Sequence, residues 1–263
     1  MITVADNLQV TDPGVARAID NRDAEAIRAN IDLSLAAGAD AVDINPGPLT
    51  RDPEDKMVFL VETVQSVTDK PLLLDTTNPR ALAAGLAVAR NPVIINGFSL
   101  ETVKLEHILP LAAQYDADII GYLLDTDSRV PTEVDDCLSL AAELFDAFSR
   151  SGADPGRLII DPVVAPLIWT NGLQHNRSVL AVIPRLADLF GFAVRTIAGI
   201  SNLTTGQADY RRRMRLEQAF IPMLAAAGLD MALMNMRHAE SIQCLRACRL
   251  LMRSEVFAWE AMG

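Results

Sequence analysis

Short apolar runs alternate with longer amphipathic stretches along most of the chain. Eight runs rich in Val, Ile, Leu and Ala predict β-strands. Several of them are continuously apolar, which is typical of parallel strands that are covered on both faces. The predicted strands are residues 2–5, 41–44, 71–74, 92–95, 118–124, 157–160, 194–200 and 230–234.

The stretches between these strands have the apolar spacing of helices. Gly38, Gly152 and Gly228 follow three of them, where glycine suits the left-handed residue that ends a helix. Eight strand-helix units predict an α/β fold, a closed (β/α)₈ TIM barrel that forms a single domain over residues 1–263, with an open doubly wound sheet as the alternative. The predicted helices are residues 20–38, 53–69, 79–90, 101–115, 132–151, 175–190, 211–227 and 238–252.

An Asp or Asn follows every predicted strand. In a barrel these positions surround the carboxyl end, where catalytic side chains come from several strands. The alternative is that they only cap the following helices, since Asp and Asn are good N-caps. We expect no Lys or Arg at the mouth to compensate them. The residues are Asp6, Asn45, Asp75, Asn96, Asp125, Asp161, Asn202 and Asn235.

The composition of the chain argues against nucleic acid and membranes as its partners. The 263 residues are 50% hydrophobic, and 34 acidic against 23 basic side chains give a net charge of −11. This balance argues against nucleic acid as a partner, because such binding needs many Lys and Arg contacts. Asp230 interrupts the most apolar segment before it reaches membrane-spanning length. With no export signal at the N-terminus, we expect a cytoplasmic protein.

The usual catalytic motifs are missing from the sequence. Its 3 cysteines and 3 histidines are not spaced as metal ligands, so we expect no directly bound metal. There is no nucleophile elbow and no glycine-rich phosphate loop. Recognition of a neutral polar heterocycle remains, because carboxylates and amides can hydrogen-bond to the edge of a pterin or a purine.

Five segments, taken in order and spacing, carry a family resemblance over essentially the whole chain. They are residues 41–48 (AVDINPGP), 74–78 (LDTTN), 94–96 (IIN), 160–162 (IDP) and 199–202 (GISN). The chain resembles the methyltetrahydrofolate:corrinoid-protein methyltransferases. These belong to the pterin-binding barrels, with the dihydropteroate synthases and the folate domain of cobalamin-dependent methionine synthase.

The resemblance implies a homodimer that works in one-carbon metabolism. It would bind 5-methyltetrahydrofolate in the mouth and exchange the N5 methyl group with the cobalt of a corrinoid on a separate corrinoid-binding protein. Asn202 and Asp75 are the implied catalytic residues. The implied pterin-binding residues are Asp75, Asn96, Asp161, Asn202, Ser201, Asp43 and Asn45.

Asn202 matches the asparagine that lies beside N5. A tertiary amine is a poor leaving group until it gains positive charge, so a hydrogen bond that strengthens with protonation of N5 would accelerate transfer. An amide cannot be the acid itself at neutral pH. We therefore expect the proton to come from solvent or a water network, in which Asp43, Asp75 or Asp125 can take part.

The chain departs from the family pattern at two places. Asp6 stands where many members have Glu, and Glu217-Gln218 stands in place of an Asn-Arg pair after the seventh strand. Arg211 and Arg212 are either a solvated helix face or a contact for the anionic folate tail or an acidic partner.

Two other functions stay open. A dihydropteroate synthase shares the Asp and Asn positions but would need cationic groups, including a lysine after the seventh strand. A non-catalytic pterin-binding subunit would only dock a corrinoid partner. The identity of the corrinoid protein and the direction of transfer are not encoded in these motifs.

Overall fold

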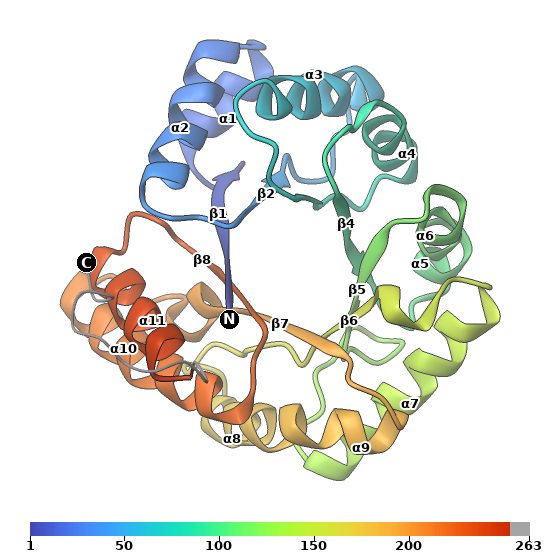
Figure 1. Ribbon diagram of the computed structural model, residues 1–263, viewed down its shortest axis with the longest axis vertical. Coiled ribbons are helices and arrows are strands. Elements are labelled where there is room, and N and C mark those ends of the chain that lie inside the picture. Colours follow the sequence, from blue (N-terminus) through green and yellow to red (C-terminus); the bar gives the residue numbers. More distant parts are fainter. Residues whose placement is uncertain (253–263) are drawn as a thin grey trace.

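The computed structural model describes residues 1–252, which form a closed barrel of eight parallel strands. The strands are arranged in sequence order, and β1 pairs with both β2 and β8 (Figure 1). This confirms the predicted TIM barrel and excludes the open sheet. The strands are β1 (Ile2–Gln9), β2 (Ala41–Asn45), β3 (Leu72–Leu74), β4 (Val93–Phe98), β5 (Asp118–Tyr122), β6 (Leu158–Asp161), β7 (Arg195–Gly199) and β8 (Met231–Met234).

Helices surround the barrel and cover its outer face (Figure 1). They are α1 (Pro13–Asp20), α2 (Ala24–Ala36), α3 (Pro53–Gln65), α4 (Pro79–Val88), α5 (Thr102–His107), α6 (Leu109–Tyr115), α7 (Val134–Arg150), α8 (Gly172–Val182), α9 (Leu186–Phe190), α10 (Tyr210–Ala227) and α11 (Ala239–Leu251). Short 3-10 helices are η1 (Pro155–Arg157), η2 (Ile183–Arg185) and η3 (Ile200–Thr204).

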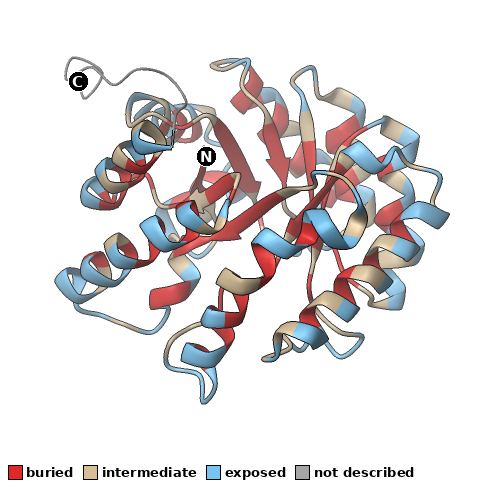
Figure 2. Cartoon of the chain, turned by 60° about the horizontal axis from the view of Figure 1, so that its bottom comes forward, coloured by how far each residue is buried: buried red, intermediate tan, exposed pale blue. Residues whose placement is uncertain are grey.

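The barrel interior is a packed core. Each strand contributes one buried apolar side chain to a common cluster, as expected for a TIM barrel whose centre is filled. Larger clusters fill the space between the strands and the helices, so burial follows the strands and the inner helix faces (Figure 2). The interior cluster is Val4, Ala41, Leu73, Ile94, Ile120, Ile159, Ile197 and Met231.

Two predicted helices are each broken in two, and one helix was not predicted. The predicted helix 20–38 corresponds to α2, which Asp23 caps, whereas α1, which Asp12 caps, lies before it. The predicted helices 101–115 and 175–190 break near Pro110 and Pro184. Proline lacks an N–H and clashes with the preceding turn, so a continuous helix is unfavourable there.

Three predicted strand ends are also wrong. β1 continues to Gln9, so Asp6 lies inside the strand, at an irregularity of the β1–β2 register between Ala5 and Leu8. β4 continues to Phe98, so Asn96 also lies inside its strand. β5 ends at Tyr122, two residues before the predicted end.

The predicted left-handed glycines after three helices are confirmed, since Gly38, Gly152 and Gly228 all have positive φ. Among the described residues, no helix is long and apolar enough to cross a membrane.

Candidate functional site

The polar residues predicted for the mouth all lie at or near the carboxyl ends of the strands. Asn45 and Asp161 end β2 and β6, Asp75 directly follows β3, and Asn202 lies in η3 after β7. None of the eight predicted mouth residues is the N-cap of a described helix, so the capping interpretation is wrong. Four of them instead accept backbone N–H groups two residues further on: Asn45, Asp125, Asp161 and Asn235.

Asp43, Asn96 and Tyr122 form a hydrogen-bonded row across β2, β4 and β5. Asn96 Nδ2 donates to Asp43 Oδ1 at 3.0 Å, and Tyr122 Oη donates to Asn96 Oδ1. Asp43 and Asn96 are both buried. Burial and the neighbouring Asp75 carboxylate raise the pKa of Asp43 well above its ordinary value. The row holds the Asn96 amide in one orientation.

Gly97 allows this placement of Asn96. The β4–β5 register shifts between Asn96 and Phe98, and a Cβ on Gly97 would collide with the Ile120 carbonyl oxygen. Only glycine fits this close approach of two strands. The bulge and the amide orientation therefore depend on one another.

Asp75 lies beside Asn45. Asn45 Nδ2 donates to Asp75 Oδ2 at 2.6 Å. Burial raises the pKa of Asp75 to about 7, partly offset by the charge of Lys104. Lys104 Nζ lies 5.5 Å from the centre of the Tyr122 ring. The expectation that no Lys or Arg lies at the mouth is therefore wrong, because α5 brings Lys104 to the β3–β5 side.

Asp161 is the third carboxyl of the group. Its Oδ1 accepts a hydrogen bond from Val163 N–H at 2.7 Å, and burial raises its pKa to about 7. Within residues 1–252, Oδ2 makes no hydrogen bond. A carboxyl with one oxygen fixed and the other open to the mouth can accept N–H groups of a ligand.

Asn202 and Ser201 stand on the opposite side of the mouth, in η3. Asn202 is exposed, whereas Ser201 is half-buried and donates to Asp6 Oδ2 at 3.0 Å. Burial raises the pKa of Asp6 to about 6. Asp125, by contrast, accepts from Asp127 N–H and Arg129 N–H in its own loop.

A buried hydrogen-bonded pair, His238 and Glu217, lies behind Asp6. His238 Nδ1 donates to Glu217 Oε2 at 3.0 Å, and Glu217 also accepts from Ser241 and Thr204 at 2.8 and 3.2 Å. Glu217, which stands in place of the family's Asn-Arg pair, lies inside α10 as the predicted helix 211–227 indicated, and its side chain is buried. Hydrogen bonds from His238 and Ser241 outweigh burial and lower the pKa of Glu217.

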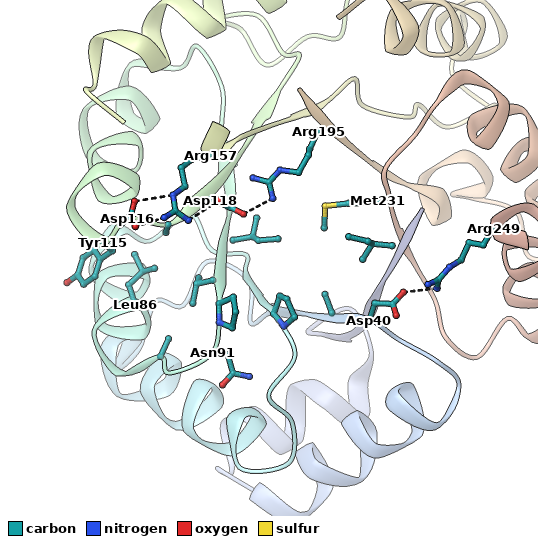
Figure 3. Close-up of a pocket in the computed structure, with 18 residues that line it drawn as sticks. Asp40, Leu86, Asn91, Tyr115, Asp116, Asp118, Arg157, Arg195, Met231 and Arg249 are labelled. Atoms are coloured by element: carbon teal, nitrogen blue, oxygen red, sulfur yellow. Dashed lines mark hydrogen bonds and ion pairs between the residues drawn. The ribbon is translucent and has the colours of Figure 1, made fainter. Parts of the chain in front are cut away.

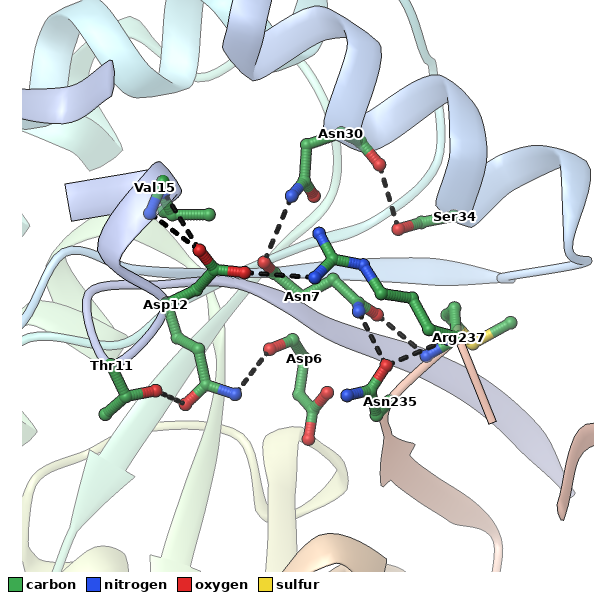
Figure 4. Close-up of polar contacts among 12 residues, drawn as sticks. Asp6, Asn7, Thr11, Asp12, Val15, Asn30, Ser34, Asn235 and Arg237 are labelled. Atoms are coloured by element: carbon green, nitrogen blue, oxygen red, sulfur yellow. Dashed lines mark hydrogen bonds and ion pairs between the residues drawn. The ribbon is translucent and has the colours of Figure 1, made fainter. Parts of the chain in front are cut away.

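Arginines near the mouth are held in pairs with aspartates. Arg237 Nη1 donates to Asp12 Oδ2 at 3.0 Å, and Asn7 donates to Asn235 at 2.8 Å, so the loops after β1 and β8 are tied together (Figure 4). Arg211 and Arg212 are exposed in the first turn of α10, and Arg212 lies 3.6 Å from the capping Asp209.

A cavity of about 500 Å³ lies at the other end of the barrel, around the first residues of the strands (Figure 3). Its charged side chains neutralise each other: Arg195 and Arg157 bind Asp118 at 2.8 and 3.4 Å. Arg249 binds Asp40 at 2.8 Å. This end has paired charges, whereas the mouth has carboxyls with raised pKa values, so the mouth is the candidate site.

Sequence reasoning missed several members of the site. Tyr122 and Lys104 were not singled out, although Tyr122 ends β5 and Lys104 lies on the helix after β4. The Glu217–His238 pair joins residues 21 positions apart. Within the described residues, no group of three or more His, Cys, Asp or Glu side chains is arranged to hold a metal ion.

Together these groups can bind a flat polar heterocycle. Asp75, Asn96 and Asp161 offer acceptors and one amide donor from three strands, a set that matches an aminopyrimidinone edge. Asn202 offers an exposed amide on the other side of the opening.

Comparisons with known proteins agree with this chemistry. The profile of the family described as "Pterin binding enzyme" matches residues 7–235. The chain is 24% identical to the methylcorrinoid:tetrahydrofolate methyltransferase of Eubacterium limosum over 237 residues, which cover 89% of this chain and 85% of that protein. It is 25% identical to methionine synthase of Mycobacterium leprae over 75% of this chain, which spans only 17% of that relative.

Solved structures with the same fold include dihydropteroate synthases. The Stenotrophomonas maltophilia synthase with active site-bound imidazole superposes with a TM-score of 0.70 at 17% identity, over 97% of this chain and 94% of that chain. The Xanthomonas albilineans synthase in complex with 7,8-dihydropteroate superposes with a TM-score of 0.66 at 19% identity, over the same shares. At this identity the likeness concerns the fold alone.

Proposed function

Since the chain belongs to the pterin-binding enzyme family, we propose that it transfers the N5 methyl group between 5-methyltetrahydrofolate and the cobalt of a corrinoid on a separate protein. The observation that carries the proposal is the pairing of a buried Asp and Asn group on one side of the mouth with the exposed Asn202 on the other. The similarity to a methylcorrinoid:tetrahydrofolate methyltransferase supports the reaction.

In this proposal Asp75, Asn96 and Asp161 hold the pterin ring. Asp161 and Asp75 accept N–H groups of the ring, and their carboxylates give stronger hydrogen bonds than neutral acceptors would. Asn45 and Asp43 fix the side chains of Asp75 and Asn96 through hydrogen bonds of 2.6 and 3.0 Å. The ring then lies across the mouth, with N5 toward η3.

Asn202 accepts the hydrogen bond from protonated N5 through its amide oxygen. The neutral tertiary amine has no N–H to donate, so this bond forms only with the ammonium from which the methyl group leaves. Asn202 therefore stabilises the charge that develops during transfer, with little effect on binding of the ground state. Ser201 is the neighbour that links this position to the barrel wall.

Two features favour methyl transfer over the synthase reaction. Residues 200–209, which follow β7, contain no Lys or Arg that could receive a departing diphosphate. Arg237, after β8, is paired with Asp12 at 3.0 Å. A synthase would need cations at these places to stabilise the leaving group.

The partners follow from the same reaction. A corrinoid-binding protein brings its cobalt to the mouth, and we propose that the chain acts as a homodimer. Arg211 and Arg212, exposed at the start of α10, would attract the anionic tail of folate or an acidic partner. If Michaelis constants for both substrates stayed the same in the double alanine variant at every salt concentration, this role would be excluded.

One incubation tests the function. The purified chain is given 5-methyltetrahydrofolate with a labelled methyl group and a reduced corrinoid, and the label is followed into the corrinoid. Transfer supports the proposal. A parallel incubation with a dihydropterin diphosphate and 4-aminobenzoate tests the synthase, and pterin binding without either reaction would favour the non-catalytic subunit.

A further inference from the structure

We propose that Asp6 is a positioning residue that supplies a proton to the mouth through the hydroxyl of Ser201, next to Asn202. The inference rests on the proposed methyl transfer and gives that reaction its proton source. Among residues 1–252, Asp6 is the carboxyl that hydrogen-bonds to the Ser201–Asn202 segment.

The geometry links three elements. Asp6 lies in the bulged part of β1, Ser201 and Asn202 lie in η3 after β7, and β8 separates the two strands. Ser201 Oγ is 3.0 Å from Asp6 Oδ2, so the hydroxyl bridges from the buried carboxyl to the half-buried edge of the mouth. Figure 4 shows the Asp6 carboxyl apart from the Asp12–Arg237 ion pair.

The second oxygen of Asp6 favours a protonated carboxyl. Asp6 is only 8% exposed, and Oδ1 is buried with no hydrogen-bond partner in the described part of the chain. An ionised carboxylate with a bare buried oxygen is unfavourable, whereas a neutral carboxyl loses less when it is removed from water. The bare oxygen therefore favours the protonated form of Asp6.

The neighbouring groups set the pKa of Asp6, and with it how readily the carboxyl gives up its proton. Burial is the main reason that the pKa of Asp6 rises to about 6, and the Glu217 carboxylate adds to the rise, while Ser201 and His238 lower it. On the other side Asp43, on β2, also faces Asp6 and has a raised pKa. A pKa near 6 suits an acid that works close to neutral pH.

Asp6 can supply the one proton that N5 gains in the reaction. N5 gains one proton on its lone pair, and when the methyl group leaves for the electron pair of the reduced corrinoid, the bonding pair of the C–N bond stays on N5 as its new lone pair. Ser201 passes its hydroxyl proton toward N5 and takes the proton of Asp6. Asp6 is left as a carboxylate and is reprotonated from solvent, and the same path runs backwards for the reverse reaction.

The test is the pH profile of single-turnover methyl transfer, at saturating 5-methyltetrahydrofolate and between pH 5 and 8. The variant Asp6→Asn keeps a side chain of the same shape but has no titrating proton, and Ser201→Ala removes the relay. Each should slow transfer by about 100-fold at pH 5.5 and flatten the profile. Affinity for the pterin should change less than threefold, and Asp6→Glu should restore part of the rate.

The control is Asp146→Asn, which removes an exposed carboxyl on α7 and should keep the wild-type profile. Melting curves identify a variant that fails to fold, in which case Ser201→Ala decides. Wild-type rate and pH dependence in both Asp6→Asn and Ser201→Ala would overturn this inference alone. No transfer by the unsubstituted chain at any pH would overturn the proposed function as well.

Discussion

Gly199 and Asn202 are so close that a Cβ on Gly199 would lie 2.9 Å from the side-chain nitrogen of Asn202. A contact this short would push the amide away from the end of β7. Gly199 has φ −80°, so alanine fits its backbone conformation, and the crowding of Asn202 is the expected effect of substitution. Gly199 therefore controls where the amide stands in the mouth.

We predict that Gly199→Ala lowers the rate of methyl transfer by about 10- to 100-fold, since small misplacement of a stabilising group is costly. Pterin affinity should change by less than threefold. The control is Gly156→Ala at the other end of the barrel, where the new Cβ would lie 3.4 Å from its nearest neighbour. Equal rates in both variants would contradict the role of Gly199.

Replacing Asn202 itself separates binding from chemistry. Asn202→Ala should lower the transfer rate by about 100- to 1,000-fold, because it removes a hydrogen bond that is strong only in the transition state. Titration calorimetry with 5-methyltetrahydrofolate should show affinity within a few-fold of the unsubstituted chain. Loss of binding with a normal rate would show that the amide holds the pterin instead.

Pterin binding should become tighter as the pH rises from 6 to 8. The pKa values of Asp75 and Asp161 are about 7, and only their ionised forms accept two N–H groups from the ring. Binding therefore releases protons, and the dissociation constant should fall until both carboxyls are ionised. Measuring it at pH 6, 7 and 8 is sufficient. Tighter binding at pH 6 would be inconsistent with carboxylates as the acceptors.

The Asp161 carboxyl should make the folded chain less stable as the pH rises. Its pKa is about 7 in the folded chain against an ordinary value of 3.8, so the folded state binds the proton more tightly. Stability from this group is full below about pH 4 and falls as the pH rises toward 7. Asp161→Asn keeps an acceptor for Val163 N–H and should raise the Tm more at pH 8 than at pH 5.

The matched control for this melting experiment is Asp154→Asn. Asp154 is exposed and accepts from Gly156 N–H at 2.9 Å, a contact of the same kind. Its substitution should change the Tm by a similar small amount at both pH values. A larger gain for Asp161→Asn at pH 5 than at pH 8 would have the wrong sign for a raised pKa.

The paired charges at the other end of the barrel should affect stability only. Asp118→Ala removes the partner that Arg157 and Arg195 share. Because both arginines are partly exposed, we expect a loss of about 1 kcal/mol, which lowers the Tm by about 2–4 °C. Transfer rate and pterin affinity should stay unchanged, and a large change in either would assign that end a functional role.

The barrel could be predicted because continuous apolar strands and helical periodicity repeat locally, and each pattern carries its own signal. The Asp or Asn in or just after the carboxyl-terminal part of each strand could be found in the same way, from position alone. The orientation of Asn96 could not, since it depends on Gly97 and on Tyr122 from the next strand.

Hydrogen bonds between residues that are far apart in the sequence could not be predicted, for a different reason. Glu217 falls in the predicted helix 211–227, but the helical pattern does not show that its side chain is buried against His238, Ser241 and Thr204. Asp6 was placed after its strand because the apolar run ends at Ala5, yet β1 continues through polar residues that pair with β2. Apolar patterns do not show polar residues that are satisfied by distant partners.

The central claim is that the mouth performs methyl transfer, and the absorption spectrum of the corrinoid tests it most directly. The chain is mixed without oxygen with 5-methyltetrahydrofolate and a reduced corrinoid. We predict conversion of the reduced to the methylated corrinoid, slowed by about 100-fold or more with Asn202→Ala. An unchanged cobalt spectrum, with the pterin shown to be bound, would contradict the account.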